Sequence, residues 1–339
     1  STHCISSAAS DVYKRQEHII RSTGNAIARL TRGNGRVVIV NYHRVLAAPS
    51  PFLRSEPDID IFTWQMELLA RCFNVLSLRE ALAAVDAGRV PPRAVCITFD
   101  DGYRSVHDLA LPVLRRLGLP ATVFVSSGYV DGRTMWNDRI VEAVDTLPAE
   151  ELDLAEFGLG VYSLRSMPER AATLGTLTEA SKYLPPQERS RLVGRLQTLV
   201  GERASEGLML TPEMVVNLDR HGIEIGAHTV SHPILTSLDD ASAMQEIRDG
   251  KRELEELIGK PVTLFAYPNG KVGKDFDGRH VAMVREAGFQ AAFTTAVGAF
   301  TRHHDRFQLP RSRPWDETPF RFGLRLLSWM ALGLSLIHI

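Results

Sequence analysis

Two short segments of the sequence bring together residue types that can bind a metal ion and move a proton. Asp100 and Asp101 stand side by side after a short apolar run. His228 and His232 stand four residues apart after a second strand-like run, a spacing that predicts one face of a helical turn. One carboxylate and two imidazoles form a facial ligand set that leaves metal positions open for water and substrate. The other carboxylate is then free to act as a base.

These segments read Thr-Phe-Asp-Asp-Gly at residues 98–102 and His-Thr-Val-Ser-His-Pro at residues 228–233. Their order, spacing and strand context, from about Val37 to Trp315, resemble the polysaccharide deacetylases, the family-four carbohydrate esterases that share the NodB homology domain. The resemblance implies hydrolysis of N-acetyl, or sometimes O-acetyl, groups on a sugar polymer with the help of a divalent metal.

The resemblance also assigns roles to these residues. In the family, the second aspartate of the pair binds the metal and the first does not, so the expected ligands are Asp101, His228 and His232. We expect one divalent metal, Zn²⁺, with Co²⁺, Ni²⁺ or Mn²⁺ as alternatives. Asp100 is then the expected general base, because metal binding lowers the pKa of a water toward ~7. The alternative is that Asp100 only orients the ligands.

Four further residues are candidates for the wall of the site. His43 ends a predicted strand, and the branch of the family that acts on exported bacterial polysaccharides carries a similar tyrosine-histidine pair there; a capping or packing role is the alternative. Tyr267 and Asn269 occupy the family's third motif and are expected to contact substrate. Trp136 follows another strand, where it could stack on a sugar or simply stand at the rim.

The sequence departs from the family pattern in ways that matter for proton transfer. Ala266 replaces an arginine that pairs with the base, and Asn269 replaces a tyrosine, although a backbone N–H donor survives that change. Arg311 stands where a histidine acid is expected. Because a guanidinium stays protonated, we expect Arg311 to pair with Asp100 and keep it ionised. His43 then becomes the candidate proton donor to the leaving amine.

Strand-like and helical patterns alternate along the chain. Strands are predicted at residues 37–42, 94–99, 121–125, 223–226, 262–267, 291–295 and 307–309, and helices at 63–71, 78–87, 109–117, 242–258 and 280–287. Near-continuous apolar strands favour a parallel sheet covered on both faces. The pattern therefore predicts an α/β fold, an incomplete or distorted (β/α)7 barrel with its site at the C-terminal ends of the strands. A helical insertion is predicted between strands three and four, at about residues 138–210, either shaping access to the mouth or serving as a solvated elaboration.

Composition narrows the function classes. Charged residues make up 23% of the chain, hydrophobic residues 44%, and the net charge is −1, which favours a soluble globular enzyme and gives no sign of nucleic-acid binding. No apolar run is long enough to predict a spanning helix. Cys72 and Cys96 do not suggest a disulfide scaffold. Oligomeric state and the compartment, cytoplasmic or periplasmic in a bacterium, stay open.

Both ends of the sequence carry an unusual coding signature. Residues 6–16 can be encoded by DNA that resembles a transposon-based sequencing adaptor. Residues 334–339 can be encoded by the reverse complement of the DNA for residues 11–16. We therefore interpret residues 1–16 and 334–339 as adaptor artefacts, and residues 17–333 as the NodB-like domain.

Three functions are compatible with these patterns. The main prediction is metal-dependent removal of acetyl groups, foremost N-acetyl groups, from a bacterial surface polysaccharide or exopolysaccharide. The first alternative is a metal-dependent hydrolase of another non-peptide C–N bond, such as a small amide. The second is a non-catalytic sugar-binding module, which the complete aspartate and histidine set disfavours.

Overall fold

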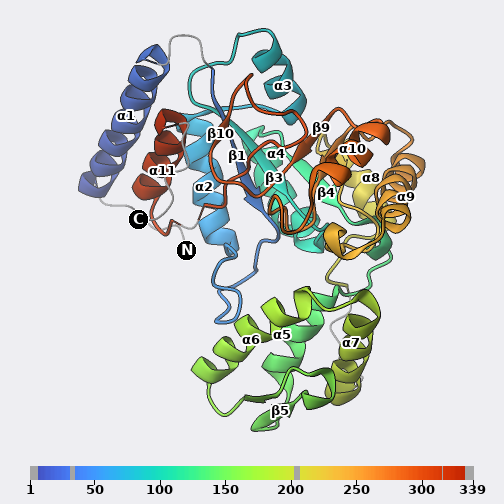
Figure 1. The fold of residues 1–339 in the computed structure, drawn as a ribbon. Coiled ribbons are helices and arrows are strands. Elements are labelled where there is room, and N and C mark those ends of the chain that lie inside the picture. The colour runs from blue at the N-terminus through green and yellow to red at the C-terminus, as the bar shows by residue number, and fades with distance from the viewer. Residues whose placement is uncertain (1–6, 31–34, 202–206, 315, 333–339) are drawn as a thin grey trace.

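The centre of the protein is a curled, mainly parallel sheet (Figure 1). The structure is a computed structural model that describes residues 7–30, 35–201, 207–314 and 316–332. The strand order is β10-β1-β3-β4-β7-β8-β9, with β2 paired to β3, and within the described part of this sheet only the β1–β10 pair is antiparallel. The strands are β1 (Val37–Tyr42), β2 (Asn74–Val75), β3 (Ala94–Phe99), β4 (Thr122–Val125), β7 (Glu224–Ala227), β8 (Leu264–Ala266), β9 (Ala291–Phe293) and β10 (Ala299–Phe300).

The segment after β10 completes the ring between β9 and β1. Leu309 forms a parallel bridge with Phe293 of β9, and Ser312 forms one with Val40 of β1. The predicted strand at 307–309 is therefore wrong as a regular strand, because the contacts are isolated bridges around Pro310, which has no N–H to donate to a ladder. The ring as a whole confirms the predicted distorted (β/α)7 barrel.

Helices flank the barrel sheet, and all of them except the helix at Pro212–Arg220 lie where the sequence predicts them. They are α2 (Ile59–Cys72), α3 (Leu78–Asp86), α4 (Leu111–Leu117), α8 (Pro212–Arg220), α9 (Asp240–Ile258) and α10 (Gly278–Glu286). Local signals set their ends: Ser77 and Glu80 form a capping box at the start of α3, and Gly118 ends α4 with φ of 64°. A π-helical turn, Val106–Ala110, precedes α4 and was not predicted.

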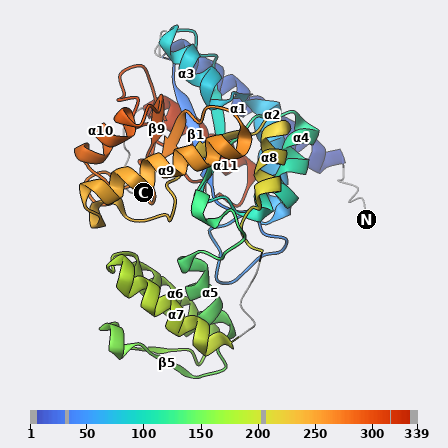
Figure 2. The same cartoon turned by 90° about the vertical axis from the view of Figure 1, so that its right-hand side faces the viewer.

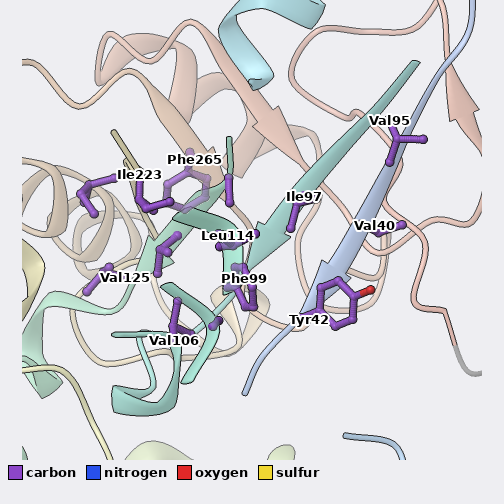
Figure 3. Packing of buried hydrophobic residues seen from close by; sticks show 14 of the residues in the cluster. Val40, Tyr42, Val95, Ile97, Phe99, Val106, Leu114, Val125, Ile223 and Phe265 are labelled. Atoms are coloured by element: carbon purple, nitrogen blue, oxygen red, sulfur yellow. The ribbon is translucent and has the colours of Figure 1, made fainter. Parts of the chain in front are cut away.

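Alternation along the strands divides their side chains between two cores. Val40, Val95 and Ile97 belong to the layer between the sheet and its helices (Figure 3). Ile39 and Cys96, one position away, belong to the cluster inside the barrel. Because side chains alternate faces, the polar residues that follow on the inner side of β1 and β3 point to the barrel mouth.

The chain between β4 and β7 forms a separate lobe (Figures 1 and 2). It contains α5 (Trp136–Thr146), α6 (Met167–Lys182), α7 (Pro186–Val200) and a hairpin of β5 (Glu151–Asp153) and β6 (Val161–Ser163). Its own core includes Ile140, Leu177, Leu192 and Leu196, all fully buried. The helical insertion is thus present; the hairpin was missed because its strands are short and carry exposed polar residues.

Two helices near the ends of the chain pack beside the barrel: α1 (Ser7–Leu30) and α11 (Pro319–Leu332). Ile20 of α1 and Phe322 of α11 are fully buried. Residues 1–6 and 334–339 lie outside the described residues, so the adaptor interpretation of the ends stays a prediction. Among the helices that are described, none is long and apolar enough to cross a membrane.

Candidate active site

Three side chains at the barrel mouth can bind a metal ion together. Asp101 follows β3, and His228 and His232 follow β7. The Nε2 atoms of His228 and His232 lie 3.4 and 3.3 Å from Oδ1 of Asp101. One ligand atom from each of the three residues can be chosen so that all lie within 4.8 Å of one another. The expected ligand set is therefore brought together at a distance that suits a single ion.

The chemical state of these groups fits a divalent metal. Oδ1 of Asp101 is buried and has no hydrogen-bond partner among the described residues. Nδ1 of His228 lies 2.7 Å from the Ala266 carbonyl oxygen, which leaves Nε2 to face Asp101. Burial lowers the pKa of His232 to about 4, so its imidazole is neutral near pH 7. Burial opposes ionisation of Asp101, but His232 and His228 outweigh it and lower its pKa. A carboxylate and neutral imidazoles are the forms that a metal requires.

The backbone around the ligands is strained, and the predicted helical turn is wrong. Thr229 and His232 have φ of 66° and 54°, so the segment from His228 to His232 is an irregular turn. Asp101 also has a positive φ, of 73°. Such conformations cost about 1–3 kcal/mol each for residues other than glycine and persist only where surrounding contacts impose them. The imidazoles converge because of this turn.

Helix α9 supplies the contacts that hold the turn. Oε2 of Glu246 accepts the N–H groups of Val230 and Ser231 over 2.9 and 2.8 Å. At Gly250, an added Cβ would lie 2.8 Å from the carbonyl carbon of Thr229, so glycine allows the helix to approach this closely. The roles of both residues were not predicted from the sequence. The available signal was a glycine inside a long helix, which costs about 0.5–1 kcal/mol relative to alanine and so suggests a packing reason.

On the other side of the site, Asp100 is enclosed by protein donors. The guanidinium of Arg311 meets it with two contacts, Nη1 to Oδ1 at 2.6 Å and Nη2 to Oδ2 at 2.8 Å. Nδ2 of Asn41 donates to Oδ2 over 3.0 Å. Burial alone would raise the pKa of Asp100, but Arg311, together with His228 and His43, outweighs burial and the pKa is lowered. The structure thus brings Arg311 and Asp100 together as expected, with Asp100 ionised.

A cavity of about 700 Å³ opens above these groups. His43, Asn269 and Trp136 line it, together with both aspartates. The Trp136 ring is only 9% exposed, and the Arg189 guanidinium carbon lies 4.9 Å from its centre. Trp136 therefore lines the cavity with little exposed surface.

Tyr267 lies outside this cavity, contrary to its expected contact with substrate. Its side chain is fully buried, stacks on Phe276 at 3.7 Å between ring centres, and donates its hydroxyl to the Phe307 carbonyl over 3.1 Å. The reason is alternation: Ala266 faces the barrel interior, so Tyr267 faces the outer layer with Phe265.

Comparison with known proteins agrees with this site. A family model for polysaccharide deacetylases matches residues 87–292. The Bacillus subtilis protein YxkH is 21% identical over 242 residues, covering 71% of this chain and 59% of YxkH. A Staphylococcus aureus poly-beta-1,6-N-acetyl-D-glucosamine N-deacetylase is 23% identical over 190 residues, covering 49% of this chain and 66% of the relative. The chain thus spans less than two thirds of the length of these relatives.

Solved structures share the fold. The Streptococcus pyogenes deacetylase PplD, in complex with acetate, has a TM-score of 0.57 at 18% identity, covering 87% of this chain and 98% of PplD. IcaB from Ammonifex degensii has a TM-score of 0.55 at 20% identity, covering 88% of this chain and 97% of IcaB. The family match extends over more than half of the sequence and includes the Asp-Asp and His-His segments described above. This chain belongs to the polysaccharide deacetylase family.

Proposed function

We propose that the protein hydrolyses N-acetyl groups on a bacterial surface polysaccharide or exopolysaccharide, using a divalent metal, Zn²⁺, bound by Asp101, His228 and His232. The observation that supports this proposal is that two adjacent carboxylates have different partners. Asp101 converges with the two imidazoles, while Asp100 lies beside them and is kept ionised by Arg311. The name of the Staphylococcus aureus relative, which refers to an N-acetylglucosamine polymer, supports an N-acetyl substrate.

The protein groups around the cavity can divide the reaction among them. A divalent cation at the triad would polarise the acetyl carbonyl and make a water easier to deprotonate. Asp100 takes the proton from the attacking water, and the Arg311 pair keeps Asp100 ionised for this task. The N–H of Asn269, which has no acceptor among the described residues, can donate to the carbonyl oxygen as negative charge develops there.

His43 is the proposed proton donor to the leaving amine. It lines the same cavity as Asp100 and Asp101, and its Nδ1 is buried with no hydrogen-bond partner among the described residues. Imidazole is the side chain best suited to hold and release a proton near neutrality. We expect His43→Ala to lower kcat by about 10²–10⁴-fold without releasing metal. A near-normal rate with an unchanged basic limb of the pH–rate profile would exclude this role.

The overall proposal is tested by metal content and acetate release. The purified protein, loaded with Zn²⁺, is incubated with N-acetylglucosamine oligomers, with an O-acetylated sugar and with small amides. We expect acetate from the N-acetylated oligomers and loss of that activity when a chelator removes the metal. Turnover of small amides alone would favour a different C–N hydrolase, and binding of the oligomer without any acetate would favour a sugar-binding module.

A further inference from the structure

The cavity above the metal triad carries two lysines on its rim that have no role in the chemistry described so far. Lys182 ends helix α6 of the insertion, and Lys271 lies in the loop after β8. Both side chains line the cavity. Neither ammonium group has an ion-pair partner among the described residues. The insertion and the barrel thus each contribute one free cation to the same opening.

A buried carboxylate contacts both segments that carry the lysines. Asp275 is fully buried; its Oδ2 accepts the N–H of Lys271 over 2.9 Å, and its Oδ1 accepts the hydroxyl of Tyr183 over 3.2 Å. Nζ of Lys274 adds a second contact between the loop and Tyr183, because it lies 4.2 Å from the centre of the Tyr183 ring. Because Tyr183 directly follows Lys182, these contacts link the segments that carry the two lysines, and the two ammonium groups are close enough for Lys271 to act on the pKa of Lys182.

The other charged side chains that line the cavity have partners, so the two lysines are in excess within its lining, and Asp275 behind them offsets part of their charge. The paired groups are Asp100 with Arg311, Glu56 with Arg313, Asp316 with Arg325, and Glu179 with Lys274. Asp101 is assigned to the metal. The rim is therefore positive even though the whole chain carries a net charge of −1.

Lys182 is also partly removed from water. Burial lowers its pKa, and Lys271 and Lys274 act in the same direction, while Asp275 and Glu179 oppose them. An anion between Lys182 and Lys271 would relieve this repulsion. Attraction between charges is stronger where water is partly excluded than at an open surface.

We propose that Lys182 and Lys271 bind an anionic substituent, a carboxylate or a phosphate, on a sugar close to the acetylated one, so that the preferred substrate is an acidic polysaccharide. This inference rests on the proposed deacetylase function and specifies its substrate class. A neutral polymer would leave both ammonium groups without a partner in the complex. An acidic polymer supplies the missing charges.

The test compares three N-acetylated oligomers on the Zn²⁺-loaded enzyme. One is neutral, an N-acetylglucosamine oligomer; one carries carboxylates, a hyaluronan oligomer; and one carries phosphates, a 6-phosphorylated N-acetylglucosamine oligomer. We expect one of the anionic oligomers to have a kcat/KM about tenfold above that of the neutral one, mainly through KM, and to lose the advantage at high salt. The anionic oligomer with the higher kcat/KM shows whether the bound substituent is a carboxylate or a phosphate.

Variants assign the effect to the two lysines. Lys182→Ala/Lys271→Ala should raise KM for the preferred anionic oligomer about tenfold, leave kcat unchanged and leave the neutral oligomer unaffected. Lys182→Arg/Lys271→Arg should retain the preference for the anionic oligomer. Lys260→Ala is the matched control, because Lys260 pairs with Asp219 and precedes β8, at the opposite end of the barrel.

The outcomes separate this inference from the proposed function. If the wild type and the double variant both turn over all three oligomers equally, the proposed binding of an anionic substituent is wrong and the proposed deacetylase function still holds. Absence of acetate from every oligomer overturns the deacetylase. In that case, calorimetry with the hyaluronan and phosphorylated oligomers decides the remaining point: binding that the double variant loses supports the lysine pair, and no binding excludes it.

Discussion

The two halves of the site each contain one carboxylate, and they differ in how many hydrogen-bond donors the protein supplies to it. On the metal side, Oδ1 of Asp101 is buried and has no hydrogen-bond partner in the described part of the chain, and the histidine nitrogens approach it at 3.3 and 3.4 Å. On the other side, both oxygens of Asp100 accept contacts from Arg311, and Asn41 adds a third. A buried polar atom without a partner costs about 1–3 kcal/mol. The metal side therefore has a free acceptor that suits a cation, whereas the described donors already satisfy the Asp100 side.

This difference arises between adjacent residues because the backbone changes direction there. The N–H of Asp100 donates to the Tyr42 carbonyl over 2.9 Å, so Asp100 continues the ladder between β1 and β3 and faces the barrel interior. Asp101 then turns with φ of 73°, followed by Gly102 at 91°. Neighbouring carboxylates thus enter different environments, one filled by an arginine and one left for a metal. The position of each carboxylate, and not its residue type, therefore sets its task.

Removal of a histidine ligand should have the largest effect. We expect His228→Ala or His232→Ala to lose tightly bound metal and to lower kcat/KM by about 10⁴-fold, because the metal supplies several kcal/mol of transition-state stabilisation. Metal analysis of the purified variants together with acetate release measures both effects. His221→Ala is the control, since His221 lies after α8 and its Nδ1 contacts the Asn217 carbonyl. Stoichiometric metal in either ligand variant would contradict the assignment.

Asp100→Asn should separate loss of activity from loss of metal. The variant keeps the metal, because the triad is untouched, and loses about 10²–10⁴-fold in kcat because an amide cannot accept the proton. Asp101→Asn should instead lose metal along with activity. Retention of metal by Asp101→Asn together with its loss from Asp100→Asn would exchange the roles of the two residues.

A smaller and pH-dependent effect is expected from Arg311→Met. The guanidinium lowers the pKa of Asp100, so its removal raises that pKa, and the ionised base becomes available only at higher pH. The acidic limb of the pH–rate profile should shift upward. Stability should also fall by about 3–5 kcal/mol, because Asp100 is left buried and unpaired. Addition of Asp100→Asn should restore part of that stability; an unshifted acidic limb in Arg311→Met would show that the pair does not control the base.

The smallest effect should come from the ends of the chain. Removal of residues 1–16 and 334–339 should change the free energy of unfolding by less than about 0.5 kcal/mol and leave metal binding and acetate release unchanged. The deletion retains Ile20, the buried contact of α1, and Glu17, which pairs with Arg71 at 2.7 Å. A melting temperature lower by several degrees would show that the removed residues belong to the folded domain.

Short-range sequence patterns predicted most of the fold and the metal side of the site. Apolar runs located the main strands, and the Asp-Asp and His-His segments follow β3 and β7 as expected. The assignment of Tyr267 to the substrate failed because the alternation along β8, which places Ala266 inside the barrel, was not followed past the strand. Glu246 was missed because its contact with the histidine turn depends on how α9 packs across the sheet.

The closure of the barrel has a consequence for how the protein acquires activity during synthesis. Arg311 contacts Asp100 across 211 residues of sequence and Asn41 across 270. Contacts this distant in sequence form late and slow folding, because the loop-closure entropy must be overcome first. A nascent chain that carries the whole metal triad but has not yet exposed residues 309–312 outside the ribosome therefore has an open barrel and an unpaired base. The last part of the barrel to be translated thus closes the barrel and pairs Asp100.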